Sequence, residues 1–220
     1  MKKFSIVLLA IISLNTQLNA QEKPRFWDEV QTIKQFDKMY AAPKNPVLFV
    51  GSSSIRKWND VEITFAKYKV MNRGIGGAVI NDIIFYANDI IFPYKPRQIV
   101  LFVGENDLPD STSTPDSILN RTQRLFTLIR SKLPDVPIVY ICFKPSPVRE
   151  KYLPKCIAAT ELIKEYLKTD ANTVFVDVLH PMLTKDGKPM PEYFTADMLH
   201  MNAKGYALWE KLVKKHLKKK

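Results

Sequence analysis

The chain has 220 residues, of which 46% are hydrophobic and 25% are charged, and its net charge is +11. This length and this apolar fraction are enough for one compact domain with a substantial core. The three histidines are scattered and the two cysteines stand apart, so the sequence holds no Cys/His cluster and argues against a metal site.

The first 20 residues have the pattern of a secretory signal peptide. Lys2 and Lys3 form a charged start, residues 4–14 form a short apolar core, and the segment ends in the small residue Ala20. The apolar run is shorter than the roughly 20 residues that span a bilayer. We therefore expect cleavage near Ala20, export of residues 21–220 to the periplasm or the medium, and no stable membrane insertion.

Loss of the signal peptide removes two lysines and no acids, which lowers the net charge from +11 to +9. Much of the remaining charge lies in residues 211–220, KLVKKHLKKK. Such a tail can attract anionic polymers, but cations also suit the C-terminal end of a helix. We favour a solvated helix end and predict no nucleic-acid binding.

Short apolar runs rich in β-branched residues predict five strands that are buried on both faces. They are residues 46–51, 68–74, 98–104, 137–143 and 173–178. Helical spacing of apolar residues predicts helices over about 79–91, 115–133 and 154–168, and a last helix with Asn202 as its N-cap. This alternation predicts a single α/β domain, a three-layer α/β/α sandwich with a parallel sheet of about five strands.

The two cysteines fall within predicted regular elements. Cys142 lies in a predicted strand and Cys156 in a predicted helix. Export would permit a disulfide, but we expect two buried, inert thiols.

Ligands of parallel sheets bind beyond the carboxyl ends of the strands. The sequence places small and polar residues directly after four predicted strands, at 51–54 (GSSS), 72–77 (NRGIGG), 104–107 (GEND) and 144–147 (KPSP). This residue mix is expected around a cleft for a small substrate. The three adjacent serines raise the question of which one could act as a nucleophile.

A serine nucleophile requires a histidine base and a carboxylate that orients the base. His216 lies in the basic tail without an acidic neighbour, whereas two other histidines each complete an Asp-x-x-His: Asp177 with His180, and Asp197 with His200. We expect Asp177 within the last strand and His180 in the loop after it. We favour Asp197 and His200, because they lie in an irregular segment before the final helix that can fold over the mouth of the sheet.

Four segments carry a family resemblance: FVGSSSIRKW, NRGIGG, LFVGENDL and DMLHMNAKGY, in this order, within about residues 46–209. Together they resemble the SGNH, or GDSL-type, hydrolases, and more narrowly the branch similar to platelet-activating-factor acetylhydrolase. The resemblance implies a flavodoxin-like hydrolase fold with Ser53 as the nucleophile and Asp197 and His200 as its catalytic partners. It also implies an oxyanion hole made by the backbone N–H groups of Ser53 and Gly77 and the side-chain amide of Asn106.

The sequence departs from the family pattern at two positions. Ser52 stands where aspartate is usual, which is expected within the acetylhydrolase-like branch. Ala78 follows the second-motif glycines where a polar residue is common, so one polar contact near the acyl pocket is absent.

These features predict an exported serine esterase that removes a short acyl group, acetyl foremost, through an acyl-serine intermediate without a metal or an organic cofactor. The expected substrate is a small acylated molecule, either an acetylated sugar or a lipid-like ester. Two alternatives stay open at this point. One is a lysophospholipase or thioesterase acting on longer chains, and the other is a non-catalytic glycan-binding protein on the same scaffold.

Overall fold

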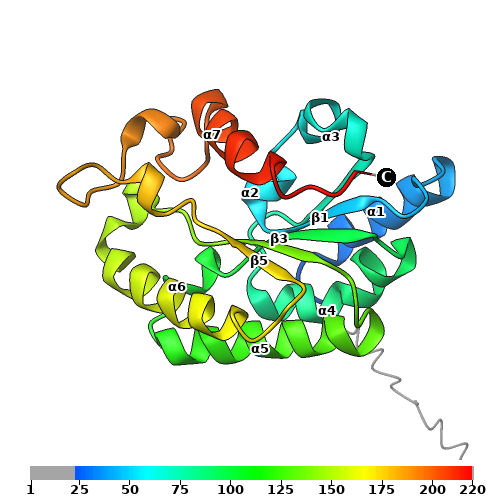
Figure 1. The fold of residues 1–220 in the computed structure, drawn as a ribbon, viewed down its shortest axis with the longest axis horizontal. Helices are drawn as coiled ribbons and strands as arrows, with labels where there is room; N and C mark the ends of the chain where they lie inside the picture. The colour runs from blue at the N-terminus through cyan, green and yellow to red at the C-terminus, as the bar shows by residue number, and fades with distance from the viewer. Residues whose placement is uncertain (1–22, 220) are drawn as a thin grey trace, which may run out of the picture.

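A five-stranded parallel sheet forms the centre of the molecule and confirms the predicted α/β fold (Figure 1). This computed structural model describes residues 23–219, so the predicted signal peptide, residues 1–20, lies outside the described residues. The strands are β1 (Val47–Gly51), β2 (Val70–Gly74), β3 (Gln98–Phe102), β4 (Ile138–Ile141) and β5 (Thr173–Val176). They pair in the order β2-β1-β3-β4-β5, and each predicted run contains one of them.

Helices cover both faces of the sheet. Helices α4 (Ile80–Ile90), α5 (Pro115–Lys132) and α6 (Leu153–Leu167) run along one face, and α2 (Ser53–Arg56), α3 (Val61–Thr64) and α7 (Ala203–Lys214) lie on the other (Figure 1). Helix α1 (Trp27–Met39) contacts α4. Short 3₁₀ turns occupy Ala66–Tyr68, Phe92–Tyr94, Glu105–Asp107, Pro147–Tyr152, His180–Met182 and Pro191–Tyr193.

The central strands are buried on both sides, as their continuous apolar runs predict. Every residue of β1 and of β3 is buried. On the α7 side, the Trp209 ring packs against Phe102 of β3 and against Trp58, with ring centroids 4.8 and 6.0 Å apart. This aromatic packing fixes α7 to the sheet and so positions the loop that precedes α7.

The predicted N-cap of the last helix is confirmed. The Asn202 side-chain oxygen accepts from the backbone N–H groups of Lys204 and Gly205, at 2.9 and 3.2 Å. Its side-chain nitrogen donates to the carbonyl oxygens of Glu192 and Phe194. Asn202 therefore ties the start of α7 to the loop before it, in addition to capping the helix.

Helix α1 was not predicted from the sequence, and Val30 is its only buried residue. Polar contacts add to the packing of Val30 and Ile33 against the core. Arg73 pairs with Asp37 of α1 and donates to the Tyr94 hydroxyl, with an Nε–Oη distance of 2.6 Å. Burial and the hydrogen bond to Asp37 raise the pKa of Tyr94 to about 12. Arg73, one of the predicted strand-end residues, thus anchors α1.

Both cysteines are buried and free, as expected. Burial raises the pKa of both thiols, that of Cys156 to about 12, so neither is a thiolate at neutral pH. Within residues 23–219, no helix combines the length and the apolar character needed to cross a bilayer. The same residues contain no group of three or more His, Cys, Asp or Glu side chains placed to hold a metal ion.

Candidate active site

Ser53 lies at the carboxyl end of β1, where the chain turns directly into α2. It is the first residue of this helix, so its N–H has no partner within the helix. The turn requires Gly51, because a Cβ at that position would lie 1.9 Å from the Phe102 carbonyl oxygen. The sequence GSSS therefore presents Ser53 at the edge of the sheet where ligands of such folds bind.

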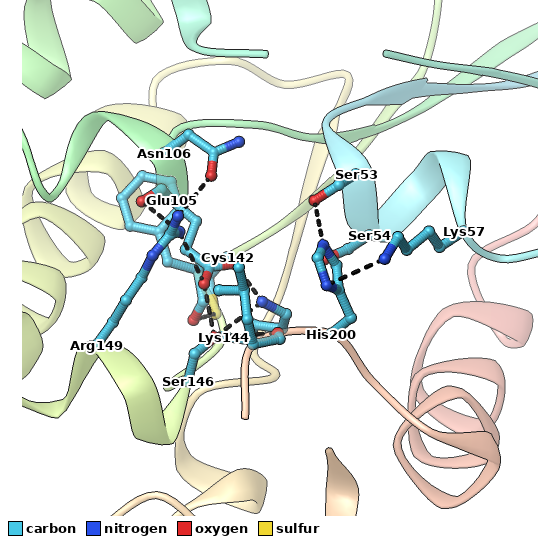
Figure 2. A network of polar contacts seen from close by, with 12 residues as sticks. Ser53, Ser54, Lys57, Glu105, Asn106, Cys142, Lys144, Ser146, Arg149 and His200 are labelled. Atoms are coloured by element: carbon cyan, nitrogen blue, oxygen red, sulfur yellow. Dashed lines mark hydrogen bonds and ion pairs between the residues drawn. The ribbon is translucent and has the colours of Figure 1, made fainter. Parts of the chain in front are cut away.

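Only the middle serine of the three contacts a histidine among the described residues. Ser52 and Ser54 are 2% and 1% exposed, whereas Ser53 is partly exposed. The Ser53 Oγ lies 3.1 Å from His200 Nε2 (Figure 2). Burial removes the two outer serines from competition, and the contact with His200 singles out Ser53.

Asp197 contacts the other ring nitrogen of His200, so that Ser53, His200 and Asp197 form a continuous chain of hydrogen bonds. The His200 Nδ1 lies 2.6 Å from Asp197 Oδ2, and Asp197 Oδ1 accepts from the backbone N–H groups of Leu199 and His200. The hydrogen bonds from the His200 ring and backbone hold the pKa of the Asp197 carboxyl well below its usual range. The resulting carboxylate favours the imidazole tautomer with its proton on Nδ1, which leaves Nε2 free to accept a proton from Ser53.

The alternative pair, Asp177 and His180, has the same local geometry. His180 Nδ1 lies 2.6 Å from Asp177 Oδ2, and Asp177 Oδ1 accepts from the N–H groups of Leu179 and His180. The His180 side chain, however, is 61% exposed, against 17% for His200, and it contacts no serine in the described part of the chain. Strand β5 ends at Val176, so the prediction that Asp177 lies within the last strand was wrong. Asp-x-x-His is thus a self-contained turn, and the nearby serine distinguishes the two copies.

Gly77 and Asn106 lie on the loops after β2 and β3. Gly77 has φ +80°, and a Cβ built on it would meet nothing within 4 Å, so its backbone borders open space. Its N–H donates to no acceptor among residues 23–219. The Asn106 Nδ2 donates to the Ala78 carbonyl at 3.0 Å, and Figure 2 shows the amide nitrogen turned towards the side on which Ser53 lies. Gly77 and Asn106 therefore offer free N–H donors of the kind that stabilise an oxyanion.

Asp107 is a buried residue that holds the loops of Gly77 and Asn106 together. Its side chain is 1% exposed, and its carboxylate accepts from the Ile80 backbone N–H at 3.1 Å and from Arg121 at 2.8 Å. Burial raises the pKa of Asp107, against the effect of Arg121. The contact with Ile80 ties the loop after β3 to the start of α4, and so to the segment that carries Gly77.

A buried ionic network lies next to Asn106 (Figure 2). The Lys144 ammonium is 2.5 Å from the Glu105 carboxylate and 2.9 Å from the Ser146 hydroxyl, and both charged side chains are almost completely buried. Arg149 pairs with the same carboxylate at 3.1 Å and donates to Asn106 Oδ1 at 2.8 Å. Removing one partner of a buried pair leaves an uncompensated charge, which typically costs about 3–5 kcal/mol, so a single substitution in this network is expected to lower the stability of the fold.

Sequence reasoning missed the contact made by Lys57. Its ammonium lies 3.2 Å from His200 Nδ1, and its side chain is exposed. Because Nδ1 already donates to Asp197, Lys57 contributes a positive charge beside the ring and not a second hydrogen bond. The signal was present in the sequence, since Lys57 follows Ser53 by four residues and this spacing brings two side chains to one side of a helical turn.

His216 lies away from this site. Its carbonyl oxygen accepts from Gln98, the first residue of β3, at the edge of the sheet opposite to Ser53. Burial lowers the pKa of its partly buried imidazole. The expectation that His216 has no part in the Ser53 site agrees with this position.

Comparison with solved structures shows the same fold in several bacterial proteins. A protein from Streptococcus pneumonia named for platelet activating factor is 21% identical, with a TM-score of 0.76, over 87% of this chain and 92% of that chain. A GDSL-like lipase from Bacteroides thetaiotaomicron is 20% identical, with a TM-score of 0.73, over 86% of this chain and 96% of that one. An acetyl xylan esterase from Geobacillus stearothermophilus is 14% identical, with a TM-score of 0.63, over 79% and 94% of the two chains. The sequence matches no curated protein.

A family model provides the decisive comparison. The model of the GDSL-like lipase/acylhydrolase family matches residues 51–208, a span that holds Ser53, Gly77, Asn106, Asp197 and His200. Five parallel strands, the serine at the end of β1 and the Asp-x-x-His before the last helix agree with that assignment. The chain therefore belongs to the GDSL-like lipase/acylhydrolase family and is a serine ester hydrolase.

Proposed function

We propose that the protein is an exported esterase that removes a short acyl group, acetyl foremost, from a small acylated molecule through an acyl-enzyme on Ser53. The observation that carries the proposal is the relay from Ser53 Oγ through His200 to Asp197, with distances of 3.1 and 2.6 Å. Each member supplies the function that acyl transfer needs from a nucleophile, a base and an orienting carboxylate.

The reaction follows from this geometry. Ser53 Oγ attacks the ester carbonyl while His200 Nε2 accepts its proton, and the N–H groups of Ser53, Gly77 and Asn106 surround the oxyanion that forms. Each donor of this kind is worth roughly 3–4 kcal/mol in the transition state. His200 then protonates the departing alkoxide. Water repeats the sequence on the acyl-enzyme, and the steps use no metal and no organic cofactor.

The packing of side chains next to the loop that carries Asn106 supports a short acyl group. Gly104, at the start of the Asn106 loop, has a Phe143 ring carbon 2.5 Å from where its Cβ would lie. Glu105 and Lys144 fill the interior next to it. The pocket lined by Glu105, Lys144, Arg149 and Cys156 is therefore too small for a long acyl chain. The fold shared with an acetyl xylan esterase makes an acetylated carbohydrate a reasonable candidate substrate, beside a lipid-like ester.

Acyl-length preference separates this proposal from a lysophospholipase or thioesterase. We expect kcat/KM for p-nitrophenyl acetate to exceed that for p-nitrophenyl octanoate by about tenfold or more, because the added methylenes have no pocket to fill and hinder the approach of the ester carbonyl to Ser53. The measurement is initial-rate hydrolysis across a series of acyl lengths. Strong turnover of the octanoate with none of the acetate would overturn the short-chain proposal.

The export proposal rests on Lys2, Lys3, the apolar residues 4–14 and the small residue Ala20. Expressed with its complete N-terminus in a Gram-negative host, the protein is expected to accumulate outside the cytoplasm with Gln21 as its first residue. Cell fractionation followed by N-terminal sequencing of the purified product checks this. An intact Met1 on a cytoplasmic product would contradict export.

A further inference from the structure

Two opposite contacts fix the orientation of the Asn106 side-chain amide. Its Nδ2 donates to the Ala78 carbonyl oxygen at 3.0 Å, and its Oδ1 accepts from Arg149 Nη2 at 2.8 Å. A carbonyl oxygen can only accept a hydrogen bond, and a guanidinium can only donate one. A flipped amide would lose both contacts, so only one orientation is satisfied, and in this orientation one N–H of Nδ2 is left for the substrate.

Arg149 is in turn held on the Glu105 side of the site. Its Nη1 donates to the Glu105 carbonyl oxygen at 3.0 Å and lies 3.1 Å from Glu105 Oε1. Glu105 is itself fixed by Lys144 and by the Ser146 hydroxyl, which donates to Oε1 at 2.6 Å. The guanidinium therefore contacts Asn106 from a largely buried position that its partners hold in place, and 16% of the Arg149 side chain is exposed.

The same loop touches the segment that carries the candidate base. The Val148 N–H donates to the Met198 carbonyl oxygen at 3.2 Å, between Asp197 and His200. Residues 144–149, KPSPVR, thus link the amide of Asn106 to the turn of His200. A displacement of Arg149 is expected to disturb the distance between oxyanion donor and nucleophile.

The charge of the network also favours this role. Burial lowers the pKa of Lys144 while its pairing with Glu105 opposes that effect. Whichever of the two holds the shared proton, the pair as a whole is neutral, because transferring a proton within the pair leaves its total charge unchanged. The Arg149 side chain adds a guanidinium cation to the network. The network therefore carries one net positive charge. The guanidinium lies 2.8 Å from Asn106 Oδ1, where it polarises the amide.

We propose that Arg149 is a positioning residue for the ester hydrolysis, which fixes and polarises the Asn106 amide in the orientation that donates to the oxyanion. The inference rests on the proposed function of Ser53 and deepens it. Arg149 acts through Asn106 and does not itself contact the reacting carbonyl.

A double-mutant cycle with Arg149→Met and Asn106→Ala tests this role. Asn106→Ala removes the donor and is expected to lower kcat by about 10²- to 10³-fold. Arg149→Met leaves a misplaced donor and is expected to lower kcat by about 10- to 100-fold, with KM changed by less than about threefold. Because Arg149 acts through Asn106, the double variant is expected to match Asn106→Ala within about threefold.

Arg130→Met serves as the matched control. Arg130 is also partly buried and makes a two-pronged ion pair, with Asp170, but it lies at the opposite end of α5 from the Ser53 site. Both variants are expected to lower the thermal midpoint, and only Arg149→Met is expected to lower kcat. If Arg149→Met does not fold, Arg149→Lys is used in the same cycle, since it keeps the charge and loses the fork that joins Glu105 to Asn106.

The outcomes separate this inference from the proposed function. Wild-type turnover together with an Arg149 variant of unchanged kcat, or with effects that multiply in the double variant, would overturn the positioning role alone. A wild-type protein that hydrolyses no ester and does not react at Ser53 would overturn the proposed function. A fall in kcat for Arg130→Met equal to that for Arg149→Met would assign the effect to lost stability and also sink the inference.

Discussion

Ser53→Ala is expected to lower kcat/KM for p-nitrophenyl acetate by about 10⁴-fold or more, because the variant loses the proposed nucleophile that forms the acyl-enzyme. Ser52→Ala and Ser54→Ala are the matched controls within the same triplet. Both serines are buried, and neither contacts His200 among residues 23–219. We expect these controls to retain kcat/KM within about tenfold of wild type, since the side chain removed lies outside the relay.

The kinetic comparison uses folded protein in every case, verified by circular dichroism. Equal losses in the three alanine variants would mean that the turn between β1 and α2 matters only as structure. A loss confined to Ser52→Ala or Ser54→Ala would move the nucleophile to that residue and contradict the assignment of Ser53.

The two Asp-x-x-His turns provide the second prediction. His200→Gln is expected to lower kcat/KM by more than about 10³-fold, because no other base lies within reach of Ser53 Oγ in the described residues. His180→Gln breaks an identical local contact, 2.6 Å between ring and carboxylate, in an exposed turn. It is expected to change kcat/KM by less than about twofold.

The two histidines make the same contact with their aspartates. Comparing His200→Gln with His180→Gln therefore separates the effect of the contact with Ser53 from the effect of the Asp-x-x-His motif. The measurement is the steady-state rate of each variant with the same acetate ester, corrected for active protein. A large loss in His180→Gln, with His200→Gln near wild type, would reverse the choice between the two turns.

Much of the fold was predictable, because strands buried on both faces have nearly continuous apolar sequences. The runs around Val47–Gly51 and Gln98–Phe102 became the central strands β1 and β3. Parallel strands all end at one edge of the sheet, so a parallel sheet predicted that GSSS, GIGG and GEND lie at the same edge. The observed order β2-β1-β3 makes the three segments neighbours. Helix α1 was not predictable in this way, since it docks through Asp37 and its partner Arg73 and buries only Val30.

At the site, sequence reasoning identified residue types and missed the contacts between distant charges. Lys144 and Arg149 stand in an ordinary polar loop, and their pairing with Glu105, about 40 positions earlier, depends on the order of β3 and β4 in the sheet. The choice of His200 over His180 likewise depends on a three-dimensional distance, because the two turns are locally the same. Only the folded chain shows which histidine faces a serine.

The most direct test of the central claim is to treat the purified protein with a fluorophosphonate and to locate the adduct by peptide mass spectrometry. Such probes phosphonylate a serine that a neighbouring base activates, with release of fluoride, and the reaction mimics the first step of acyl transfer. We predict one adduct per chain, on Ser53, which is absent from Ser53→Ala and strongly slowed in His200→Gln but not in His180→Gln. Absence of any adduct on the folded wild-type protein, or an adduct on a different serine, would contradict the account.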